Sequence, residues 1–147
     1  CDDRIDMSSF YGMFYFRVWE QTDERLKKAY QVVLEKLYNQ TPVDGVARYE
    51  GDEFFRVSGD APANPWFITT FWKARYDIAV ASSLKELERV KDLFWWAVEH
   101  ATGSGMLSEQ VRSDTGEQVS ASPLAWSHAE YVSLVHGYIR KHRELSK

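Results

Sequence analysis

Apolar side chains recur along the chain in two kinds of helical pattern, and the two kinds alternate. Residues 22–39 and 83–101 have apolar positions three or four residues apart, as expected for a helix with one buried face. Residues 2–20, 66–81 and 123–141 are apolar on nearly all sides, which is typical of a buried helix. The aromatic residues of the first stretch taken alone would also fit a strand. The pattern as a whole predicts five helices in the order buried, surface, buried, surface, buried.

Capping residues mark where these helices are expected to begin. They precede the apolar patterns at five positions, which are Asp6, Thr22, Asn64, Ser83 and Ser122. Their side chains can accept hydrogen bonds from the free N–H groups of a first turn. Glu86 completes a capping box with Ser83, and a proline follows both Asn64 and Ser122, which predicts a helix start at each proline.

The links between the predicted helices are of two lengths. Only about two residues separate the first two helices, which predicts antiparallel neighbours. Residues 40–63 and 102–122 form long links rich in glycine and polar residues, and a short hairpin is expected at residues 47–49 and 54–57. Helical hairpins placed side by side bring both long links to one face. This order predicts an all-α fold of the (α/α) toroid kind, with a functional site on that face.

Three inner helices cannot close such a ring, and their apolar sides would face water. A soluble chain rarely exposes that much apolar surface. We therefore expect these residues to belong to a larger toroid, or to need a partner chain or a second copy.

Composition excludes several classes of function. The 147 residues fit one domain and have a net charge of −4 without a basic block, which argues against nucleic acid or an anionic membrane as partner. No apolar run approaches the roughly 20 residues of a membrane span. The single cysteine, Cys1, forms no internal disulfide, and the histidines lack the spacing of metal ligands, so we expect neither a metal nor another cofactor. No signal peptide is visible, which favours a cytoplasmic over a secreted protein.

A few polar and aromatic residues in the long links are candidates for chemistry, and each also has a structural explanation. Glu109 is either an acid or base in the second loop, or a solvated loop residue. Arg48 has a planar fork that suits a hydroxyl or carboxylate. The alternative explanation is an ordinary surface arginine with no binding role. Trp66 and Trp126 lie at the starts of inner helices, where they either wall a pocket for a sugar ring or pack in the core.

Several short motifs, taken in order and at their spacing, resemble the C-terminal half of the catalytic domain of glucoamylases, glycoside hydrolase family 15, which also includes glucodextranases and some microbial trehalases. They cover roughly residues 5 to 140. The motifs are Arg48-Tyr49-Glu50, Asn64-Pro65-Trp66-Phe67 with Thr69-Thr70 behind it, Ser108-Glu109-Gln110, Asp114-x-Gly116-Glu117-Gln118-x-Ser120-Ala121, and Leu124-x-Trp126-Ser127.

The resemblance implies that residues 1–147 are the C-terminal part of a single (α/α)6 catalytic domain. It implies that Glu109 is the general base and that Ser120 is hydrogen-bonded to it. Arg48 matches a sugar-binding arginine with Tyr49 beside it, and the two tryptophans match aromatic residues of the pocket wall. The implied reaction is inverting hydrolysis, in which a second carboxyl group about 6.5–9.5 Å away protonates the leaving oxygen.

The sequence departs from the family pattern at two positions and lacks one component. Ser108 stands where many bacterial and archaeal members have proline, and His128 where fungal members have tyrosine. The general acid of the family belongs to the earlier half, which these residues do not include. Because one carboxylate cannot both activate water and protonate the leaving group, we expect the isolated chain to be inactive.

We therefore predict that these residues are part of a glycoside hydrolase that releases glucose from α-glucosidic oligosaccharides or disaccharides. Its expected partners are that substrate and the remaining half of the toroid or a partner chain. One alternative is a non-catalytic module that binds sugar or serves regulation or assembly, because the same toroid occurs, by resemblance, in regulatory subunits of phosphorylase kinase. A further alternative is a helical segment that only mediates assembly.

Overall fold

The computed structural model describes residues 3–147, so Cys1 and the cysteine-based prediction lie outside the described part. Six α-helices occur in this part. Their bounds are α1 Met7–Tyr15, α2 Glu24–Leu37, α3 Phe67–Val80, α4 Leu84–Glu88, α5 Lys91–Glu99 and α6 Ala125–Leu145. The predicted mostly helical fold is confirmed. Within residues 3–147, the helices are too short or too polar to cross a membrane.

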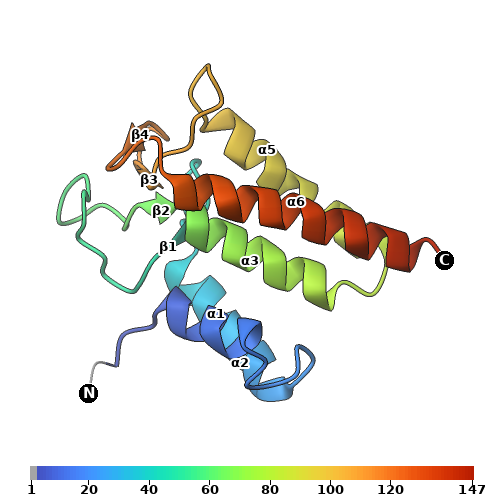
Figure 1. The fold of residues 1–147 in the computed structure, drawn as a ribbon. Coiled ribbons are helices and arrows are strands. Elements are labelled where there is room, and N and C mark those ends of the chain that lie inside the picture. The colour runs from blue at the N-terminus through green and yellow to red at the C-terminus, as the bar shows by residue number, and fades with distance from the viewer. Residues whose placement is uncertain (1–2) are drawn as a thin grey trace.

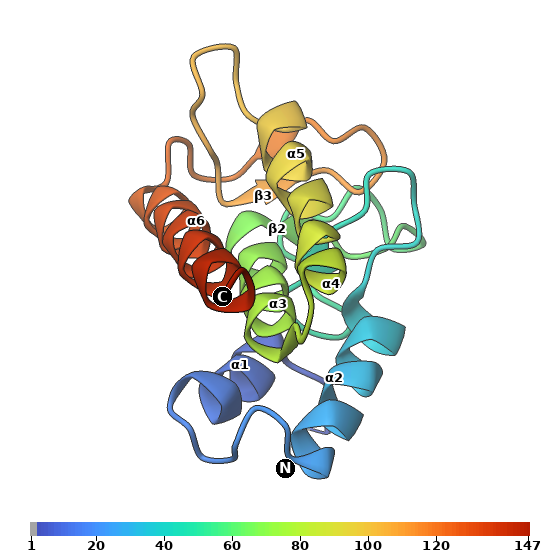
Figure 2. The ribbon, with the colours of Figure 1, turned by 90° about the vertical axis from the view of Figure 1, so that its right-hand side faces the viewer.

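Helix α3 lies at the centre of the molecule, between α1 and α6. Helices α2, α4 and α5 lie on its other side, so that the chain forms two layers (Figure 2). Helices α1, α3 and α6 run in the same direction, and the two long links gather at the end where they begin (Figure 1). Both long links therefore lie at one end, as expected. Of the three helices expected to be buried, α3 is buried along its length, whereas α6 has only Ser127 and Leu134 buried within the described residues.

The surface helix α2 forms because its apolar residues fall on one side. Leu26, Tyr30, Val33 and Leu37 are all buried, as the spacing predicts. The expected cap at Thr22 is wrong by one residue, because Asp23 is the N-cap and accepts a hydrogen bond from the backbone N–H of Arg25 at 2.8 Å.

Helix α1 is shorter than predicted. Asp6 caps it as expected, accepting a hydrogen bond from the Ser8 backbone N–H at 2.7 Å. The helix ends at Tyr15, however, and residues 16–23 form the link to α2, which is longer than the expected two residues. Phe16 and Val18 in this link are mostly exposed, with 75% and 62% of their surface accessible.

The second surface helix is interrupted. The capping residue Ser83 is confirmed, since its hydroxyl accepts from the Glu86 backbone N–H at 3.2 Å. The expected single helix over residues 83–101 nevertheless consists of α4 and α5, which are separated at Arg89 and Val90. Val90 is buried here with the core residues of α5, so the apolar spacing continues across an interruption of the helix.

The two prolines do not begin helices. Pro65 belongs to a strand, and α3 begins at Phe67 without a side-chain cap. The peptide bond between Ser122 and Pro123 is cis, and α6 begins at Ala125 after its N-cap Leu124. In both cases a backbone carbonyl of a long loop, instead of a capping side chain, accepts from the start of the helix. The Phe67 N–H donates to the Glu109 carbonyl at 3.2 Å, and the Leu124 N–H donates to the Leu107 carbonyl at 2.8 Å.

A small antiparallel sheet joins the two long loops, and the sequence does not predict it. Its strands are β1 Val46–Ala47, β2 Pro65–Trp66, β3 Gln110–Val111 and β4 Gln118–Val119, arranged in this order. The expected hairpin between residues 47–49 and 54–57 is therefore wrong, because β1 pairs with β2, Val46 opposite Trp66. Trp66 in turn lies opposite Gln110, and Gln110 opposite Val119.

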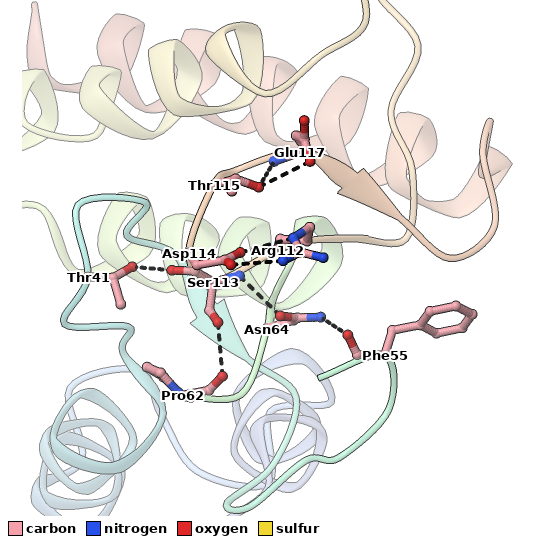
Figure 3. A network of polar contacts seen from close by, with 9 residues as sticks. All are labelled: Thr41, Phe55, Pro62, Asn64, Arg112, Ser113, Asp114, Thr115 and Glu117. Carbon is pink, nitrogen blue, oxygen red and sulfur yellow. Dashed lines mark hydrogen bonds and ion pairs between the residues drawn. The ribbon is translucent and has the colours of Figure 1, made fainter. Parts of the chain in front are cut away.

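Buried polar side chains hold the two loops together beside this sheet (Figure 3). Asn64 is 1% exposed. Its amide group donates to the Phe55 carbonyl at 2.8 Å, and its side-chain oxygen accepts from the Ser113 N–H at 3.1 Å. The Thr41 hydroxyl donates to the Ser113 carbonyl at 2.6 Å. Asn64 therefore connects the loops, where its position before proline had suggested a helix cap.

Candidate functional site

The small sheet gathers the predicted site residues although they are far apart in the sequence. Arg48 follows β1, Trp66 lies in β2, Glu109 precedes β3 and Ser120 follows β4. Because β1, β2, β3 and β4 are neighbours in that order, these residues occupy adjacent positions at one end of the molecule. The two-residue strands give no periodic pattern in the sequence, so this arrangement appears only in the structure.

The backbone of Glu109 is fixed on both sides. Its N–H donates to the Ala121 carbonyl at 2.9 Å, and its carbonyl accepts from the first N–H of α3 at 3.2 Å. The side chain is half-buried, and one carboxylate oxygen accepts a hydrogen bond from the Ser120 hydroxyl. The predicted contact between these two residues is present in the structure. A carboxylate held in this way keeps acceptor capacity for a further donor such as water.

Ser120 has an unusual backbone conformation. Its φ angle is +66°, in the left-handed region that most residues avoid. This residue follows β4 directly, which places it across the sheet from the residue before β3. The local strain therefore coincides with the contact to Glu109, as is often found where a side chain is held for function.

Arg48 lies in a cluster of polar and aromatic groups around a buried carboxylate. Asp52 is 1% exposed. It accepts hydrogen bonds from Arg48 Nη2 at 3.2 Å and from Trp66 Nε1 at 3.1 Å, and the Phe54 N–H donates to it at 3.0 Å. The Arg48 guanidinium carbon lies 4.3 Å from the centre of the Trp66 ring. Asp52 and Trp66 together fix the position of the arginine side chain.

Arg48 keeps donor capacity within this cluster. Its side chain is 35% exposed, and among residues 3–147 its Nε atom has no hydrogen-bond partner although it is buried. The Tyr49 ring lies close to two cations, since its centre is 4.7 Å from the Arg48 guanidinium carbon and 5.0 Å from that of Arg4. The cluster thus presents a partly open guanidinium group beside an aromatic ring.

The two predicted tryptophans have different environments. Trp66 is only 3% exposed and supports Arg48, which favours the packing explanation for this residue. Trp126, in the first turn of α6, is 50% exposed, and its ring centre lies 5.8 Å from that of Trp72 in an edge-to-face arrangement. Trp126 is therefore the tryptophan of the pair that has an open face for a ligand.

Helix starts converge on this end of the molecule. The first N–H of α1 donates to the Arg48 carbonyl at 2.9 Å, as the first N–H of α3 donates to the Glu109 carbonyl. The beginning of an α-helix carries a partial positive charge that stabilises nearby anions. The start of α3 thus lies against the backbone carbonyl of Glu109.

Sequence reasoning missed several residues that position the site. The sequence assigns no role to Asp52, because its pairing with Arg48 gives no periodic signal. The Ser127 hydroxyl donates to the Ser108 carbonyl at 2.7 Å, and His128 Nε2 accepts from the Leu107 N–H at 3.1 Å. Both contacts join the start of α6 to the residues before Glu109. The Ser108 hydroxyl donates to the Gln110 carbonyl at 2.6 Å, so the two departures from the family pattern have structural roles.

No group of three or more His, Cys, Asp or Glu side chains suited to a metal ion occurs within residues 3–147. This end of the chain presents a positioned carboxylate, a guanidinium group and aromatic surfaces.

Comparison with known proteins gives one consistent result. The family model described as glycosyl hydrolases family 15 matches residues 75–136. The chain has the sequence and fold of part of a glucoamylase-like domain of this family, as the motifs indicate.

Individual relatives extend the similarity over nearly the whole chain. An uncharacterised glycosyl hydrolase of Methanocaldococcus jannaschii is 32% identical over 145 residues, which are 92% of this chain and 22% of the relative. A glucoamylase of Clostridium sp. (strain G0005) is 28% identical over 141 residues, 86% of this chain and 18% of the relative. The crystal structure of a bacterial glucoamylase complexed with acarbose matches with a TM-score of 0.75 and 27% identity, over 95% of this chain and 21% of that chain.

The chain spans about a fifth of the length of these relatives. The structural match confirms the expected mostly helical architecture. The match covers 21% of the glucoamylase chain, so these residues correspond to one part of an (α/α)6 fold.

Proposed function

We propose that these residues supply the general base of an inverting glycoside hydrolase that releases glucose from α-glucosidic substrates. The single observation that carries this proposal is the contact between Ser120 and Glu109 at the start of α3. A carboxylate with a fixed backbone, one hydrogen-bond donor and an open side is suited to accept a proton from water.

In the proposed reaction, Glu109 takes a proton from a water molecule as the water oxygen attacks the anomeric carbon. The attack occurs on the face opposite the leaving group, so the configuration inverts. A second carboxyl group must protonate the leaving oxygen, and inverting enzymes hold it about 6.5–9.5 Å from the base. We assign this acid to the part of the protein that the relatives have and these 147 residues do not span.

The remaining site residues have binding roles in this proposal. The Arg48 fork, held by Asp52 and Trp66, donates hydrogen bonds to sugar hydroxyl groups, with Tyr49 beside it. The exposed face of Trp126 forms one wall for a sugar ring. The acarbose complex of the structural relative supports an oligosaccharide as the substrate class.

Replacement of Glu109 by glutamine in the complete protein tests the proposal. Glutamine keeps the size of the side chain but cannot accept the proton, so turnover on a maltooligosaccharide should fall by about 10²–10⁴-fold, with little change in thermal stability. The control is Glu117→Gln, at an exposed glutamate of the same loop whose carboxylate, among the described residues, accepts a hydrogen bond only from the Thr115 hydroxyl. Near-normal turnover of the Glu109 variant would contradict the assignment.

The stereochemistry of the product provides a second readout. An inverting enzyme releases β-glucose first from an α-glucosidic bond, and this can be followed by NMR before mutarotation. Release of α-glucose would contradict inversion while leaving the hydrolase assignment in place.

The same experiments distinguish the alternative of a binding or assembly module. Such a protein would bind maltose and release no glucose even when complete. The 147-residue chain alone is expected to release none in either case, because it offers one of the two carboxyl groups to the reaction.

A further inference from the structure

A polar cavity lies at the end of the molecule opposite the candidate site. It has a volume of about 380 Å³ and is formed by residues from α1, α3, α6 and the link after α1. These three helices run from the site end to this end (Figure 1). Its lining begins at Arg75 and Ser133, eight residues after the first residues of α3 and α6, so about two helical turns separate the cavity from the helix starts near Glu109.

Positive charge is concentrated in this cavity. Its lining includes Arg17, Arg75, Arg140 and Lys141, and one carboxylate, Glu144. The chain as a whole has a net charge of −4, so the grouping of cations does not follow from a basic composition. Like charges at close range repel one another, and such a group is stabilised when an anion lies among them.

Only part of this charge is balanced within residues 3–147. Arg75 forms an ion pair with Glu130 at 2.8 Å, and Lys141 donates to the Ala79 carbonyl at 3.3 Å near the end of α3. Neither Arg17 nor Arg140 has an ion pair in this part of the chain. Two guanidinium groups of the cavity lining thus have no carboxylate partner within the described residues.

The backbone at Arg17 provides an independent observation. Its φ angle is +54°, in the left-handed region that favours glycine, and its N–H donates to the Phe14 carbonyl at 3.1 Å in a cap after α1. Glycine is the usual residue at such a cap. An arginine in this strained position, inside a cavity with three other cations, indicates a use for its side chain.

The helix dipole explains only part of the arrangement. Cations near the C-terminal end of a helix are stabilised by its partial negative charge. Lys141 is such a cation, because it donates to the Ala79 carbonyl near the end of α3. That effect does not require an arginine in place of glycine at residue 17. It also leaves unexplained why Arg140 of a second helix lines the same cavity.

We propose that this cavity binds a small oxyanion of the phosphate type. The guanidinium forks of Arg17 and Arg140 match tetrahedral oxyanions by paired, charge-assisted hydrogen bonds. Ser133 and Gln21 in the lining offer neutral donors. Bound there, the anion would join the ends of α1, α3 and α6. This site is independent of the proposed hydrolysis.

Direct binding of inorganic phosphate to the complete protein tests the proposal, by calorimetric titration at constant ionic strength. Arg140→Gln and Arg17→Gly should each raise the dissociation constant about tenfold, because each removes a charged donor. The control is Lys28→Gln, which removes the same charge from the exposed side of α2 and should leave the dissociation constant unchanged. Binding is the appropriate readout, since phosphate also raises the stability of many proteins by exclusion from their surface.

The Arg17 variant separates binding from folding. Glycine adopts the left-handed conformation without strain, so weaker phosphate binding by Arg17→Gly cannot result from a damaged cap if its unfolding midpoint without phosphate is not lower than that of the wild type. Absence of phosphate binding by the wild type would overturn the proposal, as would equal binding by the wild type and both arginine variants.

Discussion

The position of the Glu109 side chain depends on contacts from three separate segments. The backbone is held by Ala121 and by the start of α3, and the carboxylate is held by the Ser120 hydroxyl. Because the backbone contacts do not involve the Ser120 side chain, removal of that hydroxyl should affect the carboxylate alone. This allows the role of the hydrogen bond to be measured separately from folding.

Ser120→Ala in the complete protein is expected to lower kcat about tenfold and to leave KM nearly unchanged. A hydrogen bond to a charged group contributes about 1.5–3 kcal/mol, and its loss allows the proposed base to leave its productive orientation. Steady-state kinetics on a maltooligosaccharide provides the measurement. Ser104→Ala, in the exposed part of the same loop, is the control. A kcat equal to that of the wild type would show that the backbone alone positions Glu109.

Replacement of Asp52 by asparagine should lower the free energy of unfolding, although the two side chains have nearly the same size. Asp52→Asn retains an oxygen acceptor but removes the charge opposite Arg48, and the new amide group faces the N–H of Trp66. Since Arg48 is about a third exposed, we expect a loss of about 2 kcal/mol in the free energy of unfolding. Chemical denaturation gives the value. Asp114→Asn, in the exposed ion pair with Arg112, should have little effect, and equal effects of the two variants would contradict the role assigned to Asp52.

At the scale of the elements, the sequence predicts what local patterns control. The apolar stripe of α2 and the caps Asp6 and Ser83 depend on neighbouring residues and are confirmed. The sheet depends on pairing between residues far apart, such as Trp66 and Gln110, and its strands are too short for an alternating pattern. The prolines after Asn64 and Ser122 misled the prediction, because backbone carbonyls of the loops satisfy the helix starts.

The same distinction applies to the site. Arg48, Glu109 and Ser120 were found through motifs of a known family, whereas Asp52 and Asn64 were not assigned their observed roles. Each has a hydrogen-bond partner in another segment, Trp66 for Asp52 and Gln110 for Asn64. Their burial is visible only in the folded chain. Sequence motifs therefore identified the candidate chemistry, and the structure identifies the groups that hold it in place.

The approach of β1 to α5 gives a prediction at this scale. Gly45 has a φ of +88°, and a Cβ atom added there would lie 2.6 Å from Pro65 Cβ and 2.8 Å from Trp96 Cζ2. Gly45→Ala should therefore lower the free energy of unfolding by about 3 kcal/mol, from backbone strain and overpacking together. Chemical denaturation measures this loss.

Gly51→Ala is a matched control for this variant. Gly51 also has a positive φ, +75°, but nothing lies within 4 Å of an added Cβ. Its replacement should cost only the backbone strain, about 1 kcal/mol. Equal losses for the two alanine variants would show that the close approach of Pro65 and Trp96 to Gly45 does not limit the packing of the sheet against α5.

At the scale of the whole molecule, apolar side chains remain exposed on the inner helices. Val132 and Ile139 lie seven residues apart on the same side of α6 and are 54% and 42% exposed, while Leu134 on the opposite side is fully buried. A second exposed group occurs at the end of α1, where Tyr15 is 51% exposed. Because the relatives are about five times longer than this chain, we infer that further parts of the toroid cover these surfaces.

Replacement of both exposed α6 residues by lysine tests this inference. In the complete protein, Val132→Lys/Ile139→Lys should lower the free energy of unfolding by about 4 kcal/mol or more, since two apolar side chains lose their burial and two charges enter an interface. In the 147-residue chain alone, the same change should reduce self-association in light scattering without loss of stability, because it removes apolar surface from water. The double variant Gln31→Lys/Ser58→Lys adds the same charge at exposed polar positions and should leave the stability of the complete protein unchanged. If the α6 variant is as stable as this control in the complete protein, the outer side of α6 faces solvent there, and the toroid arrangement proposed for these residues is wrong.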